Sequence, residues 1–304
     1  MLNIRLKGVR LENPTVLASG ILGVSGASLV NIANHGAGAV TSKSVSLEER
    51  KGHPCPILLT FEAGVMNAVG LSNPGVEKII EELEHYKQNS DAPLIASIFA
   101  SKTKDFGIAA KKISEAKPDI IEANISCPNV EAEFGKPFAA DPKMAAAVTK
   151  VVKKNTKIPV FVKLSPNVPN IGMIAKAVEK AGADGITAVN TAGPGMVINI
   201  DAGKPLLANK VGGISGPAIK PIAVKCVYDV YEAVKIPIIG TGGITTGRDA
   251  VEMIMAGATA VGIGSGVYYR GIEIFQRVCD EIVEFMEENN YSSLKQIRGI
   301  AHGK

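Results

Sequence analysis

Residues 159–191, PVFVKLSPNVPNIGMIAKAVEKAGADGITAVNT, contain the repeating unit on which the fold prediction rests. Two short apolar runs, 159–165 and 185–191, enclose an amphipathic stretch near 170–181. Apolar runs of this length that are bounded by Gly, Pro or Asn indicate buried strands, and the stretch between them has the length and pattern of a helix. The segment therefore predicts a strand, a helix and a second strand, which is the unit of a parallel sheet.

The same alternation of strand and helix patterns runs along the whole chain. We predict eight strands, at 15–19, 39–44, 93–100, 120–127, 159–165, 185–191, 237–243 and 260–266. Helical patterns lie near 26–36, 75–89, 103–116, 141–155, 170–181, 217–234, 246–256 and 271–289. Eight such units close naturally into a (β/α)8 TIM barrel, so residues 1–304 are expected to form a single α/β barrel domain. A doubly wound open sheet is the alternative, but no GxGxxG motif follows the first strand.

Segments outside this repeat are expected at the two ends of the barrel. The first ten residues are expected to form a short β-hairpin that closes the bottom. Two connections, 45–92 after the second strand and 192–236 after the sixth, are far longer than a helix needs. Long loops that follow barrel strands lie at the carboxyl end of the barrel, where active sites are built. We therefore expect these two connections to roof the site.

Composition and charge exclude several classes of protein. The chain is 46% hydrophobic and 20% charged, which is enough apolar material for a large core. Its net charge of +4 is spread without a basic block, which is typical of a solvated mixed surface and not of a nucleic-acid-binding protein. The N-terminus lacks the apolar core of a signal peptide, and no continuous apolar stretch is long enough to span a membrane.

The four cysteines indicate a reducing compartment. Cys55, Cys127, Cys226 and Cys279 form no CxxC pair and have no Cys/His spacing typical of a zinc site or an iron–sulfur cluster. We therefore expect no metal in this chain and a cytoplasmic location. Cys55, Cys226 and Cys279 are assigned no role.

Polar side chains stand at the predicted carboxyl ends of several strands. Lys43 lies at the end of the second strand, Asn124 and Lys163 lie near the ends of the fourth and fifth, and Asn190 and Thr191 end the sixth. A single lysine at a strand end can simply extend to solvent. Two lysines on nearly uniformly apolar strands, together with the amides, favour a planar polar ligand that supplies hydrogen-bond partners.

Glycine-rich segments end the last two strands, with GTGG at 240–243 and GIGSG at 262–266. Loops after these strands commonly form the phosphate site of a barrel, because glycines let backbone N–H groups approach an anion and a following helix N-terminus adds a favourable dipole. Tight turns alone are the structural alternative. The pattern favours a phosphorylated ligand without identifying the compound.

Cys127 is the candidate catalytic residue. It stands at a strand end beside Pro128 and opens the segment CPNVEAEFGKPF at 127–138, in which Gly135 and Pro137 are candidate hinges of a lid. A lone cysteine in a barrel is commonly a small buried hydrophobe, but this position favours catalysis. No histidine is close in sequence to activate the thiol as a nucleophile, so we predict a general base or acid.

The motifs of the chain together resemble the dihydroorotate dehydrogenase family. They are TSKS at 41–44, NAVGLSNPG at 67–75, NISCPN at 124–129, VKLSPN at 162–167, AVNT at 188–191, GGISGPAIKP at 212–221, GTGGI at 240–244 and GIGSG at 262–266. Cys127 resembles class 1, because the membrane-bound class 2 enzymes have serine there and an N-terminal extension. The phrases VKLSPNV and LANKVGGISGPAIKP resemble the NAD-linked class 1B catalytic subunit more than the fumarate-linked class 1A.

The resemblance implies an FMN enzyme that oxidises (S)-dihydroorotate to orotate in pyrimidine biosynthesis. Cys127 would be the base for the C5 proton, and FMN would accept the hydride from C6. The implied phosphate cradle is Gly242, Gly243, Gly264 and Ser265, and the implied flavin contacts are Ser19, Lys43, Ser44, Asn124, Lys163, Val189 and Gly216. The implied substrate contacts are Lys43, Asn67, Ala68, Val69, Gly70, Leu71, Asn124, Asn129, Asn190 and Thr191.

The resemblance also implies partners. The sequence contains no Cys₄ cluster motif and no second dinucleotide fingerprint, so this chain alone is not expected to use NAD⁺ efficiently. Class 1B implies a homodimer of the catalytic chain and a heterotetramer with a subunit that carries FAD and a [2Fe-2S] cluster. Two alternatives remain: a related flavin barrel such as a dihydropyrimidine or dihydrouridine reductase, and a non-catalytic flavin- or phosphate-binding barrel.

Overall fold

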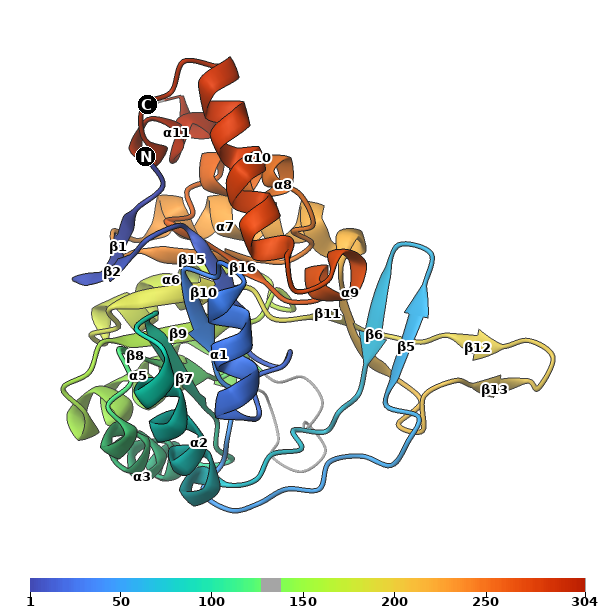
Figure 1. The fold of residues 1–304 in the computed structure, drawn as a ribbon. Coiled ribbons are helices and arrows are strands. Elements are labelled where there is room, and N and C mark those ends of the chain that lie inside the picture. Colours follow the sequence, from blue (N-terminus) through green and yellow to red (C-terminus); the bar gives the residue numbers. More distant parts are fainter. Residues whose placement is uncertain (127–137, 304) are drawn as a thin grey trace.

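The structure is a computed structural model that describes residues 1–126 and 138–303. Within these residues, eight parallel strands form a closed barrel in the order β10-β15-β16-β3-β4-β7-β8-β9 (Figure 1). The barrel strands are β3 (Thr15–Leu17), β4 (Ala39–Thr41), β7 (Leu94–Ile98), β8 (Ile120–Asn124), β9 (Val160–Leu164), β10 (Gly185–Ala188), β15 (Ile238–Thr241) and β16 (Ala260–Ile263). Each lies inside a predicted strand, so the (β/α)8 prediction is confirmed.

Helices surround the barrel. The longer ones are α1 (Gly26–Asn34), α2 (Val76–Asn89), α3 (Thr103–Ile113), α5 (Pro142–Asn155), α6 (Ile171–Lys180), α7 (Lys220–Ala233), α8 (Gly247–Met255) and α10 (Ile274–Glu288). Each buries one apolar face, as α2 does with Ile79, Leu83 and Tyr86. Full burial of one such side chain stabilises the fold by roughly 1.5–3 kcal/mol. No helix in the described part of the chain is both long and apolar enough to cross a membrane.

Short helical turns complete the helical layer. They are η1 (Ser114–Ala116), η3 (Phe138–Ala140), η4 (Pro217–Ile219), α9 (Gly266–Arg270), α11 (Leu294–Ile297) and η5 (Ile300–His302). The strand predicted over 260–266 ends at Ile263, and α9 begins at Gly266. Gly271 has a left-handed φ of 73° and separates α9 from α10, which explains why the helix predicted over 271–289 begins later.

The N-terminal hairpin closes the bottom of the barrel, as expected. Its strands are β1 (Ile4–Leu6) and β2 (Val9–Leu11), which pair antiparallel through a two-residue turn. Leu6 and Leu11 are completely buried and pack with Phe161 and other side chains from the amino ends of the barrel strands. This cluster fills the lower half of the barrel and leaves the carboxyl ends of the strands for a site.

The two long connections meet in a second sheet above the barrel. Its strands are β5 (Leu58–Phe61), β6 (Gly64–Asn67), β11 (Ala192–Gly195) and β14 (Gly212–Ser215), in the order β11-β14-β6-β5. β6 belongs to the first connection and β14 to the second, and they pair antiparallel with Asn67 opposite Gly213. A ribbon of β12 (Ile198–Asn199) and β13 (Lys204–Pro205) projects from this sheet (Figure 1).

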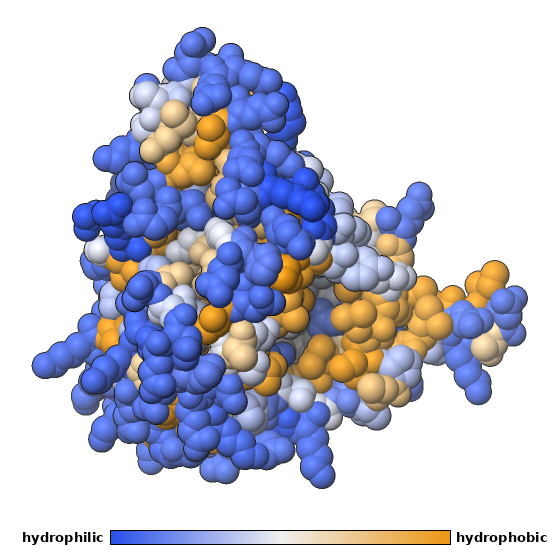
Figure 2. Space-filling view, in the orientation of Figure 1, coloured by the Kyte–Doolittle hydropathy of each residue, from blue (hydrophilic) through white to orange (hydrophobic). Residues whose placement is uncertain are grey.

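Apolar side chains gather on the surface of this second sheet and ribbon (Figure 2). The exposed ones include Leu58, Met196, Ile198, Ile200 and Leu206, and Ile200 is 88% exposed. Contiguous apolar surface of this kind is typical of a protein–protein contact.

Candidate active site

A cavity of about 420 Å³ lies between the carboxyl ends of the barrel strands and the second sheet. Most of the expected site residues line it. They are Ser19, Lys43, Ser44, Asn67, Val69, Gly70, Leu71, Asn124, Lys163, Val189, Asn190, Thr191, Gly216, Gly242, Gly243, Gly264 and Ser265. The volume is within the range of small-molecule and cofactor sites.

Of the expected site residues that the structure describes, one is not among those that line the cavity. Ala68 is completely buried and packs with Met66 and Leu207. It lies between Asn67 and Val69, and successive side chains of an extended segment point to opposite faces, so its side chain is directed away from the cavity. Cys127 and Asn129 lie outside the described residues, as do the candidate hinges Gly135 and Pro137.

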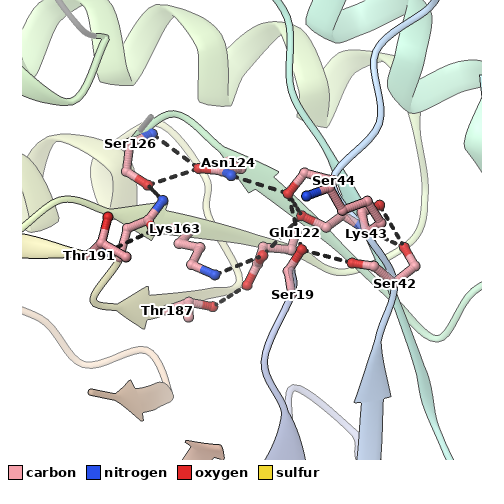
Figure 3. A network of polar contacts seen from close by, with 12 residues as sticks. Ser19, Ser42, Lys43, Ser44, Glu122, Asn124, Ser126, Lys163, Thr187 and Thr191 are labelled. Carbon is pink, nitrogen blue, oxygen red and sulfur yellow. Dashed lines mark hydrogen bonds and ion pairs between the residues drawn. The ribbon is translucent and has the colours of Figure 1, made fainter. Parts of the chain in front are cut away.

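A network of hydroxyl and amide groups forms one side of the cavity floor (Figure 3). Ser19 Oγ donates to the carbonyl oxygen of Ser42 at 2.8 Å and lies 3.1 Å from Ser44 Oγ. Ser44 Oγ also accepts a hydrogen bond from Asn124 Nδ2 at 3.1 Å. Hydrogen bonds therefore connect three different strand ends through Ser19, Ser44 and Asn124, which are all expected flavin contacts.

The network continues from Asn124 to the end of β10. Ser126 Oγ donates to Asn124 Oδ1 at 2.8 Å, and Asn190 Nδ2 donates to Ser126 Oγ at 2.8 Å. The N–H of Thr191 donates to Asn190 Oδ1 at 2.8 Å. Each amide oxygen thus accepts a hydrogen bond from the protein. Among the described residues, each side-chain NH₂ group donates one of its two hydrogens, so the second could serve a ligand.

A buried ion pair completes the floor. Lys163 Nζ lies 3.7 Å from Glu122 Oε1, and the two residues are only 4% and 3% exposed. Ser97 Oγ donates to Glu122 Oε1 at 3.0 Å, and Thr187 Oγ1 donates to Oε2 at 2.9 Å. Glu122, Ser97 and Thr187 are not among the residues predicted from the sequence. A glutamate inside the apolar strand IIEAN, two residues before Asn124, is nevertheless a signal for Glu122.

Glycine backbone forms the other end of the cavity. Gly242 and Gly243 have φ values of 140° and 74°, and a Cβ atom on Gly243 would lie 2.5 Å from Lys220 Cβ. Only glycine fits this path. No hydrogen bond within residues 1–126 and 138–303 uses the N–H groups of Gly243, Gly264 or Ser265. Backbone donors without partners in a glycine-rich turn are suited to an anion.

The amino end of α8, which the sequence suggested as part of a phosphate site, is already occupied by a carboxylate of the protein. Thr246 and Asp249 form a capping box, and Asp249 Oδ2 accepts the backbone N–H groups of Thr245 and Thr246 at 3.0 and 2.9 Å. Burial alone would raise the pKa of Asp249, but hydrogen bonds from Lys220 and Thr245 lower it to about 2. This helix end already has an anionic partner, so the glycine turns are the better place for a phosphate.

One buried hydroxyl in the cavity wall has no partner. Thr241, at the end of β15, lines the cavity, and its Oγ1 makes no hydrogen bond within the described part of the chain. Buried polar groups are nearly always hydrogen-bonded, so an exception in a cavity wall indicates a ligand group or water.

The cysteines other than Cys127 are remote from this chemistry. Cys226 and Cys279 are buried in α7 and α10, and burial raises the pKa of each thiol to about 11. Both thiols are therefore neutral near pH 7, and Cys55 is exposed. None of these three lines the cavity. The described residues contain no group of three or more His, Cys, Asp or Glu side chains that could hold a metal ion.

The chain is similar to known proteins over nearly its whole length. The family model for dihydroorotate dehydrogenase matches residues 1–286. A protein of Methanocaldococcus jannaschii named "Dihydroorotate dehydrogenase B (NAD(+)), catalytic subunit" is 50% identical over 305 residues, which cover 99% of this chain and 98% of the relative. A protein of the same name from Methanosarcina mazei is 48% identical over 298 residues, which cover 98% and 94%.

A solved structure supports the fold. The crystal structure of DHODH from Eimeria tenella in complex with ferulenol superposes with a TM-score of 0.84, at 22% identity, over 99% of this chain and 88% of that one. The family assignment itself rests on the family model and on the two curated relatives. The chain belongs to the dihydroorotate dehydrogenase family.

Proposed function

We propose that this chain is an FMN-dependent enzyme that oxidises (S)-dihydroorotate to orotate in the de novo synthesis of UMP. The observation that carries the proposal is one cavity of about 420 Å³ with a glycine-rich turn at one end and lysine and amide side chains on its floor. A phosphorylated flavin and a planar pyrimidine need these two surfaces side by side. The names of the relatives that are 48% and 50% identical support the same reaction.

The residues present fit FMN. Within the described residues, the N–H groups of Gly243, Gly264 and Ser265 and the hydroxyl of Thr241 have no hydrogen-bond partner. The N–H groups suit a phosphate, and the hydroxyl suits a polar ligand group in the same wall. Bound FMN would supply the acceptor for the hydride that leaves C6 of dihydroorotate. The phosphate would be held by Gly242, Gly243, Gly264 and Ser265. The ring would contact Ser19, Lys43, Ser44, Asn124, Lys163, Val189 and Gly216.

The floor amides would orient the substrate and meet its developing charge. Lys43 would pair with the substrate carboxylate, and Asn67, Asn124 and Asn190 would donate to the pyrimidine carbonyls. Negative charge develops on a carbonyl oxygen when the C5 proton leaves, and donors that are already oriented stabilise it most. Asn124 and Asn190 meet this condition because Ser44 and Ser126 hold their amides. Further contacts would come from Val69, Gly70, Leu71, Asn129 and Thr191.

Cys127 would be the base, with Sγ taking the C5 proton. This role rests on the motif NISCPN at 124–129, because Cys127 lies outside the described residues. A free thiol ionises near pH 8.5, so the thiolate fraction, and with it the rate, should rise through the mildly alkaline range.

The electrons would leave through a second protein. We propose that the chain works in the cytoplasm as a homodimer within a heterotetramer, whose other subunit carries FAD and a [2Fe-2S] cluster and reduces NAD⁺. The words "catalytic subunit" in the names of the relatives support a partner. The exposed apolar surface around Leu58, Ile198 and Ile200 supports a protein contact on that side of the molecule.

Substrate discrimination tests the proposal. Holoprotein with FMN would be mixed anaerobically with dihydroorotate, dihydrouracil or dihydrouridine, and the rate of flavin bleaching would be measured. We expect rapid bleaching by dihydroorotate alone, because only this substrate has a carboxylate for Lys43. Faster bleaching by dihydrouracil or dihydrouridine would favour a related pyrimidine reductase, and a protein that binds no FMN would refute the proposal outright.

A further inference from the structure

We propose that Glu122 is a positioning residue for Lys163 and that its carboxylate sets the charge at the floor of the cavity. The inference rests on the proposed function, because it concerns the field at a flavin bound there. Glu122 is not among the residues that line the cavity, whereas Lys163 is. Glu122 can therefore affect a ligand in two ways: by holding Lys163 in place, and by the electric field of its own carboxylate.

Four neighbouring barrel strands bring the group together. Ser97 of β7 is the register partner of Glu122 of β8, and Thr187 of β10 is the register partner of Lys163 of β9. The side chains of Lys163 and Thr187 point toward Glu122 (Figure 3), and Ser97 donates to the same carboxylate. Strand ladders, not loops, therefore fix the 3.7 Å between carboxylate and ammonium. A group held by rigid strands is well suited to setting a constant field.

Both charges are removed from water, and each has the other as its partner. Ser97 and Thr187 donate to the two oxygens of Glu122, so the carboxylate is satisfied without solvent. Within the described residues, the carboxylate of Glu122 is the one anionic partner of Lys163. A buried ion pair is often replaceable by apolar side chains without loss of stability. Its position directly below a ligand cavity therefore points to a role in the field there.

The proposal predicts opposite effects of the two charges on the flavin. The pair is neutral overall, and reduced FMN carries more negative charge than oxidised FMN. Glu122→Gln keeps the size and a hydrogen-bond acceptor but adds one positive charge to the floor, so reduced FMN should be favoured. Lys163→Met removes the positive charge and should favour oxidised FMN. The double variant restores neutrality and should lie close to the parent.

The test is the ratio of the affinities for reduced and oxidised FMN, measured as the midpoint potential of the bound flavin against a reference dye. We expect Glu122→Gln to raise this ratio about tenfold, which converts to roughly 30 mV for a two-electron couple. Lys163→Met should lower it by a similar factor. Glu122→Asp keeps the charge and should return the potential to the parent value. Thermal unfolding of each apoprotein measures stability separately from the potential.

Thr187→Val is the matched structural control. It removes one hydrogen bond from Glu122 but no charge, so it should lower the unfolding temperature while leaving the potential unchanged. Equal potentials in parent and Glu122→Gln, or equal shifts in Glu122→Gln and Thr187→Val, would overturn the inference while leaving the proposed function intact. If Glu122→Gln does not fold, the double variant of Glu122→Gln and Lys163→Met is compared with Lys163→Met. Equal potentials in these two proteins would overturn the inference. Failure of the parent to bind FMN overturns both.

Discussion

Asp249→Asn is expected to lower the free energy of unfolding and to make that free energy depend less on pH. Asp249 anchors the loop after β15: Oδ1 lies 2.8 Å from Lys220 Nζ, and Oδ2 accepts from Thr245 and Thr246. Its pKa falls from an ordinary 3.8 to about 2. A pKa lowered by this amount corresponds to a contribution of at most about 2.5 kcal/mol to the free energy of unfolding. Because solvent screens the charge, we expect Asp249→Asn to cost about 1–2 kcal/mol.

The sign of the pH dependence follows from the lowered pKa. A carboxyl group with a lower pKa in the folded state stabilises the protein above its unfolded pKa, and this stability is lost as the pH falls from about 3.8 to about 2. The difference in unfolding free energy between parent and Asp249→Asn should therefore have its largest value at pH 7 and should decrease as the pH falls from about 3.8 to about 2. Urea unfolding at several pH values measures it.

Asp229→Asn is the matched control. Asp229 forms an exposed i,i+4 pair with Lys225, whose side chain is 71% exposed, so its loss should cost less than about 0.5 kcal/mol. Equal destabilisation by the two substitutions, or a difference in unfolding free energy between parent and Asp249→Asn that grows as the pH falls, would contradict the anchoring role of Asp249.

Three further predictions concern the cavity. Cys127→Ala should retain FMN but slow flavin reduction by dihydroorotate at least about 10²-fold in stopped flow, the typical contribution of a positioned base; an unchanged rate would contradict its role. Lys43→Ala should weaken orotate binding, measured by titration, while changing the flavin potential less than Lys163→Ala, which should lower that potential. Gly243→Ala should weaken FMN binding about tenfold or more, because it places a Cβ 2.5 Å from Lys220 Cβ at a φ of 74°; equal affinity in fluorescence titration would place the phosphate elsewhere.

The sequence predicts the barrel well because its signals are local. Each barrel strand is an apolar run followed by an amphipathic helix, and neighbouring units pair in order around the barrel. The second sheet cannot be seen in this way. β6 and β14 are short, rich in glycine and about 150 residues apart, so their pairing depends on closure of the barrel beneath them.

The candidate site shows the same division. Lys43, Asn124 and Lys163 can be found because polar residues at apolar strand ends are conspicuous in the sequence. The partnership of Glu122 with Ser97 and Thr187 depends on the register of three different strands, which a linear pattern does not contain. The capping role of Asp249 likewise decides which backbone amides remain available to an anion.

The electron route is constrained by the chemistry of the chain. The described residues offer one lined cavity for a flavin, and the sequence contains no cluster motif. Reduced holoprotein mixed with NAD⁺ alone should therefore reoxidise far more slowly than with an artificial dye or an added FAD and iron–sulfur subunit. Rapid NADH formation from dihydroorotate by this chain alone would contradict both class 1B and the need for a partner.

The central claim is that this cavity oxidises dihydroorotate with a bound flavin. Anaerobic titration of the purified holoprotein with dihydroorotate, followed by its absorption spectrum and by orotate analysis, tests it most directly. The flavin band should bleach with one equivalent of dihydroorotate per flavin, and one equivalent of orotate should appear. A flavin band that persists in excess dihydroorotate, with no orotate formed, would contradict it.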